Sequence, residues 1–252
     1  MPSTLNSDTD TPQTSCDAPN LTKFLALHAG LSRRAAADKI KQGAVKLNGL
    51  PCSNPATRIQ PDDRVELAGK IVMAQTEKFY FLLNKPRGFV CTNSDPYAEN
   101  KAVDLINVGP EIRLYSAGRL DKASEGAIIF SNDGDFTARL THPKFGIEKE
   151  YLVSADRPLE DSQLARIRRG IMDDGELLRV QLIEKVGERK YRIRLNEGKN
   201  REIRRLLAAV GCQTKRLQRV AIGDLKLGNL PVGSYRQITP GEVSALFSSE
   251  KY

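Results

Sequence analysis

The sequence contains few of the side chains on which many hydrolases and metalloenzymes depend. Its 252 residues include two histidines, His28 and His142, and no tryptophan. So few histidines disfavour histidine-based catalytic triads and multi-histidine metal sites. We interpret both as structural or surface residues. The four cysteines, at positions 16, 52, 91 and 212, have neither paired zinc-ligand spacing nor the density of a disulfide framework. We therefore expect a reduced, cytoplasmic protein without a metal.

Long apolar runs and nucleotide-binding glycine motifs are also missing. No apolar stretch approaches the roughly eighteen residues needed to cross a bilayer, so we expect no membrane association. The chain has no phosphate-binding glycine loop followed by Lys-Ser/Thr, no dinucleotide-binding G-x-G-x-x-G and no H-E-x-x-H. Residues 1–20 are rich in Ser, Thr, Asp and Pro without the pattern of a secretory signal, and we expect a disordered tail there.

Positive charge is abundant and unevenly distributed. The chain has 39 Lys and Arg against 31 Asp and Glu, a formal net charge of +8. Such a balance favours a polyanionic partner. The basic residues concentrate in two stretches, 31–49 and 188–219. Two separate basic stretches predict one extended ligand that is contacted at two places.

The first basic stretch belongs to a predicted small module at residues 21–75. Two short helices are expected to end at Gly30 and Gly43, with Ser32 as N-cap of the second. Asn48-Gly49 is typical of a tight hairpin. The basic residues of this helix-helix-strand module suit an RNA backbone, although a solvated basic surface is the alternative. The candidates for RNA contact are Arg33, Arg34, Lys39 and Lys46.

Residues 78–252 predict a second, α+β domain. Apolar and alternating patterns indicate strands at residues 79–86, 126–131, 149–155 and 190–196. Helical patterns are expected at residues 160–170 and 200–211 and near the end of the chain, from residue 239.

The stretch "GRLDKASEG", residues 118–126, contains the best-placed carboxylate. Glycines at both ends permit close backbone approach to Asp121, and Arg119 and Lys122 favour its ionised form, as a nucleophile requires. Asp and Gly beside an apolar strand are also ordinary turn residues. The local sequence alone leaves both interpretations open.

The helix predicted at residues 200–211 carries arginines opposite an apolar stripe. The stripe follows i, i+3, i+4 and i+7 spacing and consists of Ile203, Leu206, Leu207 and Val210. The arginines that we expect to face away from the core are Arg201, Arg204 and Arg205. Such a face can bind phosphates or hold a carboxylate, or it can be a solvated basic surface. Tyr151, in "KEYLV", suits either core packing or stacking on a base.

Five stretches together resemble the RsuA-type family of ribosomal RNA pseudouridine synthases, in the same order along the chain. They are "FLLNKPRGFVCTNSDP", "GRLDKASEGAIIFSNDG", "LTHPKFGIEKEYLV", "NEGKNREIRRLLAAVG" and "KRLQRVAIGDLKL". The resemblance covers residue 78 to about residue 239. The preceding block resembles the small RNA-binding module named after small-subunit ribosomal protein four.

This resemblance implies a catalytic domain built on a mixed, mainly antiparallel sheet. The family converts a uridine of RNA to its carbon-linked isomer without any cofactor. The implied partner is ribosomal RNA, free or in pre-ribosomal particles, with the large subunit favoured and the enzyme acting as a monomer.

The resemblance also assigns roles by motif. Asp121 matches the essential aspartate, Tyr151 the tyrosine that stacks on the target base, and Arg204 the arginine that pairs with the carboxylate. Leu217 matches an apolar contact to the base. The further candidates for RNA contact are Arg119, Lys122, Lys199, Arg201, Arg205 and Arg219.

Two other functions are compatible with parts of the sequence. A non-catalytic RNA-binding or ribosome assembly factor would retain the basic surfaces, but it has no need for the intact set of Asp121, Tyr151 and Arg204. An Asp-dependent nucleoside or glycoside hydrolase requires a second carboxylate, for which Asp133 and Asp135 are candidates. The basic surfaces have no role in that hydrolase.

Overall fold

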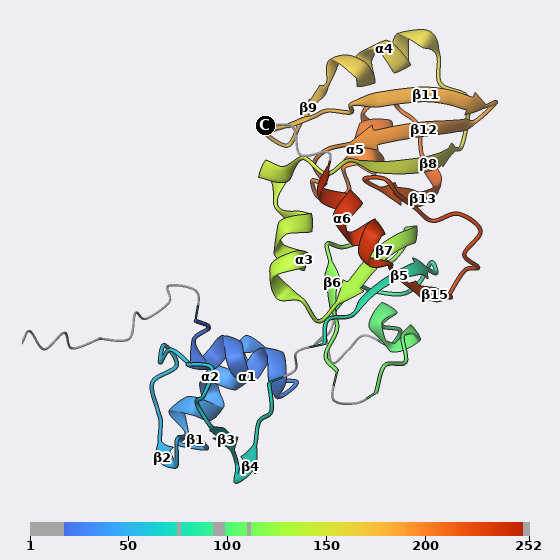
Figure 1. The fold of residues 1–252 in the computed structure, drawn as a ribbon. Helices are drawn as coiled ribbons and strands as arrows, with labels where there is room; N and C mark the ends of the chain where they lie inside the picture. Colours follow the sequence, from blue (N-terminus) through green and yellow to red (C-terminus); the bar gives the residue numbers. More distant parts are fainter. Residues whose placement is uncertain (1–17, 75–76, 93–98, 110–111, 249–252) are drawn as a thin grey trace, which may run out of the picture. The chain divides into compact units, whose positions relative to one another are not determined.

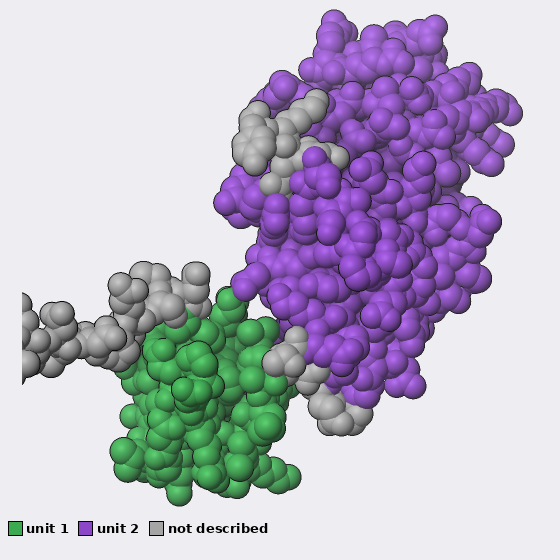
Figure 2. All heavy atoms as spheres, viewed as in Figure 1, with its two compact units in different colours: residues 1–76 green, residues 77–252 purple. Residues whose placement is uncertain are grey.

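The computed structural model describes residues 18–74, 77–92, 99–109 and 112–248. The chain forms two compact units, residues 1–76 and residues 77–252 (Figure 2). Most of the tail that the sequence predicts to be disordered, residues 1–17, lies outside the described residues.

Unit 1 packs two short helices against a small antiparallel sheet with the strand order β2-β1-β3-β4. The Ser32 side chain accepts a hydrogen bond from the Ala35 amide, which confirms the predicted N-cap. Asn48 and Gly49 both adopt positive φ, 51° and 83°, as a tight hairpin turn of the predicted kind requires. The elements are α1 (Leu21–His28), α2 (Arg33–Lys41), β1 (Val45–Leu47), β2 (Leu50–Pro51), β3 (Val65–Leu67) and β4 (Lys70–Ile71).

Unit 2 is built on one long mixed sheet. The strand order is β11-β12-β8-β13-β7-β5-β15, with β6 paired to β7 and β14 paired to β13 (Figure 1). Among the strands that the structure describes, β13 and β7 form the one parallel pair, and the others are antiparallel. A mixed, mainly antiparallel sheet in an α+β fold is therefore confirmed.

The strands of unit 2 are β5 (Tyr80–Lys85), β6 (Tyr115–Ala117), β7 (Glu125–Ser131), β8 (Lys149–Ala155), β9 (Ile171–Asp173), β10 (Glu176–Leu178), β11 (Leu182–Gly187), β12 (Lys190–Leu195), β13 (Thr214–Ile222), β14 (Leu225–Lys226) and β15 (Tyr235–Gln237). Its helices are α3 (Gly134–Thr141), α4 (Asp161–Arg169), α5 (Glu202–Ala209) and α6 (Pro240–Ser248), with short 3-10 turns at Ala102–Leu105 and Pro143–Phe145.

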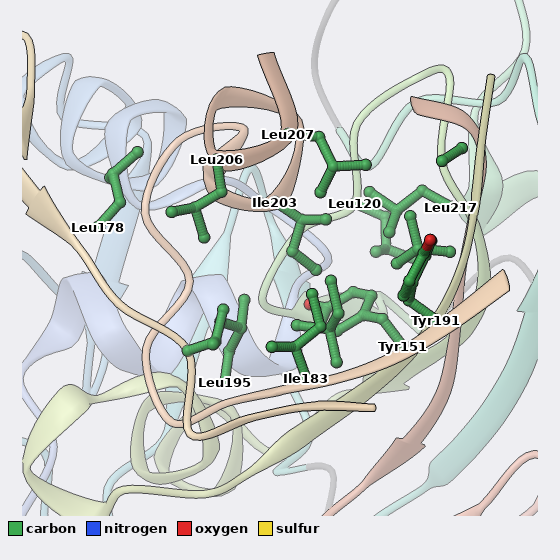
Figure 3. Packing of buried hydrophobic residues seen from close by; sticks show 14 of the residues in the cluster. Leu120, Tyr151, Leu178, Ile183, Tyr191, Leu195, Ile203, Leu206, Leu207 and Leu217 are labelled. Atoms are coloured by element: carbon green, nitrogen blue, oxygen red, sulfur yellow. The ribbon is translucent and has the colours of Figure 1, made fainter. Parts of the chain in front are cut away.

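Strand β7 of this sheet is buried on both faces. Along β7, Ile128 and Phe130 belong to one apolar cluster and Ala127 and Ile129 to another, as the alternation of a strand requires. Helices α4 and α5 contribute to the first cluster, and α3 and α6 contribute to the second. Helix α5 directs its apolar stripe toward the strands (Figure 3). A strand covered on both faces reads as a continuous apolar run, and "GAIIFS" has that pattern.

Candidate active site

Asp121 lies in the turn that leads into β7. The Ser124 amide donates to the Asp121 carbonyl at 3.0 Å, and the neighbouring Leu120 is buried. The Asp121 side chain stays 32% exposed. The turn therefore fixes the backbone of Asp121 against the core and leaves its carboxylate accessible. Asp121 can thus be a turn residue and a reactive carboxylate at the same time.

Arg204, on α5, faces Asp121 and also holds its turn. The Arg204 Nε lies 3.8 Å from the Asp121 Oδ2. The Nη2 donates to the Ala123 carbonyl at 3.0 Å and to the Ser124 hydroxyl at 3.2 Å. Because the Arg204 side chain is mostly buried, one planar guanidinium orients the carboxylate and fixes the loop that carries it.

Arg201 supplies a second positive charge near the same carboxylate. Its Nη1 lies 3.8 Å from the Asp121 Oδ2, and its backbone has φ 50° and ψ 30°, a left-handed conformation uncommon outside glycine. The segment before α5 is fixed by Glu202, which is buried and accepts from the Lys199 amide at 3.1 Å and the Arg179 amide at 3.4 Å. Burial raises the pKa of Glu202.

Lys85 ties the end of β5 to the Asp121 turn. Its side chain is fully buried, and the ammonium donates to the Ser124 carbonyl at 2.7 Å and the Pro86 carbonyl at 2.9 Å. Burial lowers the pKa of Lys85, and the charge of Arg219 acts in the same direction, whereas Cys91, Asp121 and Glu125 act to raise it. Sequence reasoning missed Lys85 and Glu202 as supports. The one available signal was a lysine at the end of the apolar run "FLLNK".

A close approach between β7 and β13 forms the other side of the turn. Gly126 has φ +103°, and a Cβ at this position would collide with the Arg219 backbone. Glycine is therefore needed at residue 126 for the two parallel strands to pair, and their pairing brings β13 next to Asp121.

A cavity of about 180 Å3 opens beside Asp121. Tyr151 and Leu217, both largely buried members of the core cluster on β8 and β13, provide apolar walls (Figure 3). A planar base can stack between such walls. Seven residues predicted from the sequence line this cavity, namely Arg119, Asp121, Tyr151, Lys199, Arg201, Leu217 and Arg219.

Three other predicted residues of unit 2 lie elsewhere. Arg204 lies behind Asp121 and does not line the cavity. Lys122 is exposed on the Asp121 turn. Arg205 binds Asp173, Nε to Oδ2 at 2.5 Å, and Glu176, Nη1 to Oε2 at 2.6 Å, so its guanidinium is already paired. In unit 1, the side chains of Arg33, Arg34, Lys39 and Lys46 are exposed.

Of the two carboxylates on which a hydrolase would depend, Asp133 has a structural role. Asp133 caps α3 and binds the Tyr80 hydroxyl at 2.9 Å and the Lys78 ammonium at 2.8 Å. Burial acts to raise the pKa of Asp133, but the hydrogen bonds from Lys78, the backbone and Tyr80 lower it overall. Neither Asp133 nor Asp135 lines the cavity. Neither Asp133 nor Asp135 is therefore placed to act with Asp121 as the second carboxylate of a hydrolase.

Comparison with known proteins settles the family. Residues 79–209 match the sequence model of RNA pseudouridylate synthases, and residues 20–65 match that of the S4 domain. The chain belongs to the RNA pseudouridylate synthase family. It is an RNA pseudouridine synthase with an N-terminal S4 domain, and the resemblance to RsuA-type synthases is confirmed.

Relatives of this family match over nearly their whole length. Ribosomal small subunit pseudouridine synthase A of Salmonella typhimurium is 31% identical over 229 residues, which cover 90% of this chain and 99% of the relative. Ribosomal large subunit pseudouridine synthase B of Bacillus subtilis is 33% identical over 233 residues, 90% of this chain and 94% of the relative. A crystal structure of a pseudouridylate synthase superposes with a TM-score of 0.66 at 32% identity, covering 90% of this chain and 99% of that one.

Membrane-spanning helices must be both long and apolar, and the helices of the described ranges can be judged by these two requirements. None combines the necessary length with sufficient apolar character.

Proposed function

We propose that this synthase isomerises a specific uridine of ribosomal RNA, with Asp121, Tyr151 and Arg204 as its catalytic residues. The observation that carries the proposal is the position of Asp121, held by Arg204 at the edge of a cavity with Tyr151 and Leu217 as walls. The relatives named above are, by name, pseudouridine synthases of the small and the large ribosomal subunit, which supports ribosomal RNA as the substrate class.

The proposed reaction begins with a flipped nucleotide. Unstacking a base costs about a few kcal/mol, which binding of the flanking RNA offsets. Asp121 then starts the cleavage of the bond between ribose C1′ and ring N1. The ring turns, C5 bonds to C1′, the C5 proton leaves with the help of Tyr151, and N1 takes up a proton. Arg204 keeps Asp121 oriented throughout.

The first test is pseudouridine mapping of ribosomal RNA from cells with and without this gene. We expect a pseudouridine to be missing in the deletion strain and restored by the wild-type gene. Relatives act on either subunit by name, so the mapping covers both RNAs, with a large-subunit position expected. An unchanged set of pseudouridines in ribosomal RNA would contradict the proposal. Fractionating the same cells and sizing the purified protein tests the proposed cytoplasmic location and monomeric state.

Unit 1 is proposed to contact the RNA backbone through its exposed cations. Replacing Arg33, Arg34 and Lys39 together by glutamine should weaken RNA binding and flatten its salt dependence. Each phosphate that a cation no longer neutralises reduces the slope of log K against log [salt] by about 0.7 to 0.9, so a total change of about 2.1 to 2.7 is expected for three cations. Binding measured over a salt series checks this, with Lys185→Gln on β11 as a control at an exposed lysine outside both basic stretches. An unchanged slope would mean that α2 does not contact RNA.

A further inference from the structure

Two cations that line the cavity, Lys149 and Arg219, have no assigned role in the proposed reaction. Lys149 precedes Tyr151 by two residues on β8, so both side chains lie on the same face of the strand. Arg219 lies opposite Tyr151 on the neighbouring strand β13. Both cations line the cavity together with Asp121. Arg219 is 4% exposed, whereas Arg119 and Arg201 are exposed.

Neither cation is neutralised by its surroundings. The Arg219 Nε donates to the Ala127 carbonyl at 2.6 Å, but its Nη2 is buried without a hydrogen-bond partner. The Lys149 ammonium makes one long hydrogen bond, 3.3 Å, to the Asn196 carbonyl. Among the described residues, no carboxylate lies within 4 Å of Lys149 or Arg219. Burial and the charge of Arg219 lower the pKa of Lys149 to about 8.

Uncompensated buried charge is costly, and folded proteins retain it mainly where a ligand completes the site. We propose that Lys149 and Arg219 form an anion-stabilising pair that binds the carbonyl oxygens of the flipped uracil while negative charge develops on the ring. The inference rests on the proposed function and assigns these two residues a part in the same reaction.

The charge arises in either route open to Asp121. If the C1′–N1 bond breaks first, its electron pair stays on the ring and spreads over N1, O2 and O4, while Asp121 balances the electron-poor C1′. If the Asp121 carboxylate instead adds to C6, the electron pair of the C5–C6 double bond moves onto C5 and O4. In both routes the ring loses this charge when C5 has bonded to C1′, the C5 proton has left and N1, released from C1′, has been protonated. In the second route the electron pair of the C5–H bond restores the C5–C6 double bond, and the bond between Asp121 and C6 breaks with its electron pair returning to the carboxylate.

The position of the pair favours the ring over a backbone phosphate. Exposed cations, Arg119 and Arg201, already line the cavity where it meets solvent. Arg219 is buried and Lys149 is half-buried, and both line the cavity together with Tyr151 and Leu217. A base that stacks on Tyr151 brings its polar edge toward Lys149 and Arg219, whereas a backbone phosphate can be neutralised by the exposed Arg119 and Arg201.

The test compares Lys149→Met with Lys149→Arg in single-turnover reactions at saturating RNA. Removing one donor aimed at developing charge is expected to slow the reaction about 100-fold, and the arginine variant should recover most of the rate. RNA affinity should change by less than about threefold, because the phosphate contacts are unaffected. Lys185→Met, at an exposed lysine of β11 outside both basic stretches, is the matched control. Thermal unfolding of each variant checks that it is folded.

An RNA with 5-fluorouridine at the target position separates charge stabilisation from a structural role. Fluorine withdraws electrons and makes the ring anion less basic, so its need for Lys149 falls. On this RNA we measure how fast the target nucleotide is consumed. The ratio of the wild-type rate to the Lys149→Met rate is expected to be about tenfold smaller than on the RNA with uridine. An equal defect on both RNAs, a defect in affinity alone, or a full rate for Lys149→Met would overturn the inference.

The pH profile gives an independent measurement. The titratable and charged groups that line the cavity with Lys149 are Arg219 on β13, Tyr151 on β8, Asp121 and Arg119 from the Asp121 turn, and Lys199, Arg201 and Glu202 at the start of α5. The charged form of Lys149 is required, and it is lost as pH rises through a pKa of about 8. kcat/KM should therefore fall above that pH in the wild type and stay high to a higher pH in Lys149→Arg. Coincident profiles would contradict the inference, whereas an inactive wild type would contradict the proposed function itself.

Discussion

Asp121→Asn is expected to abolish pseudouridine formation, with a loss of about 10⁴-fold or more in the single-turnover rate. The amide keeps the shape of the side chain but cannot act as a nucleophile or balance the charge of C1′. Folding should be nearly unaffected, because the Asp121 side chain is one-third exposed and lies 3.8 Å from both arginines rather than in a tight hydrogen bond. RNA affinity should be equal or slightly higher, because a negative charge has been removed from a cationic cavity.

The measurement needs three readouts on the same preparation. Pseudouridine formation reports chemistry, filter or fluorescence binding reports affinity, and urea unfolding reports stability. Asp161→Asn, at an exposed carboxylate in the first turn of α4, controls for the loss of a negative charge. Retained activity in Asp121→Asn would refute the assignment of the catalytic residue.

Arg204→Ala is expected to lower the single-turnover rate by about 10² to 10³-fold, because the carboxylate loses a preorganised partner. It should also reduce the free energy of unfolding by about 2 kcal/mol, since the bonds to the Ala123 carbonyl and the Ser124 hydroxyl disappear. Arg204→Lys keeps the charge but lacks the planar fork that reaches the carboxylate and the loop together. We expect its activity to lie between those of Arg204→Ala and the wild type.

Arg205→Ala is the matched control for Arg204→Ala, because it removes the next arginine of the same helix. Arg205 is paired with Asp173 and Glu176, away from the cavity, so its loss should affect stability more than chemistry. Equal catalytic defects in the two variants would show that Arg204 acts through the stability of α5 and not through Asp121.

The sequence predicted those helices and strands in which apolar residues recur with a regular period, or whose ends are marked by capping or turn residues. Ser32 and Asn48-Gly49 determine local geometry by their own chemistry, and they are found in the predicted roles. Strand β13 was missed, although it is central to the sheet. Its residues "TKRLQRVAI" alternate poorly, because Arg219 is buried where an apolar side chain would be expected. Partners distant in the sequence decide that burial, and they leave no local pattern.

For the candidate site, the motifs identified the residues but did not predict the directions in which their side chains point. The predicted outward face of α5 divides in the structure, since Arg204 faces Asp121 and Arg205 faces Asp173. The two arginines are adjacent in the sequence, and the spacing of the apolar stripe places both on the side of the helix away from the core. Lys85 and Glu202 support the site through bonds to backbone groups, which single-sequence reasoning does not detect.

The parallel pairing of β7 with β13 also determines when the enzyme becomes active during its own synthesis. Asp121 leaves the ribosome roughly a hundred residues before Leu217 and Arg219, and long-range pairing of this kind is intrinsically slow to form. Domains tend to fold in order from the N-terminus, at about 5 to 20 residues synthesised per second. The S4 unit can therefore be complete while the catalytic cavity still lacks a wall, so that a nascent chain can bind RNA before it is able to modify it.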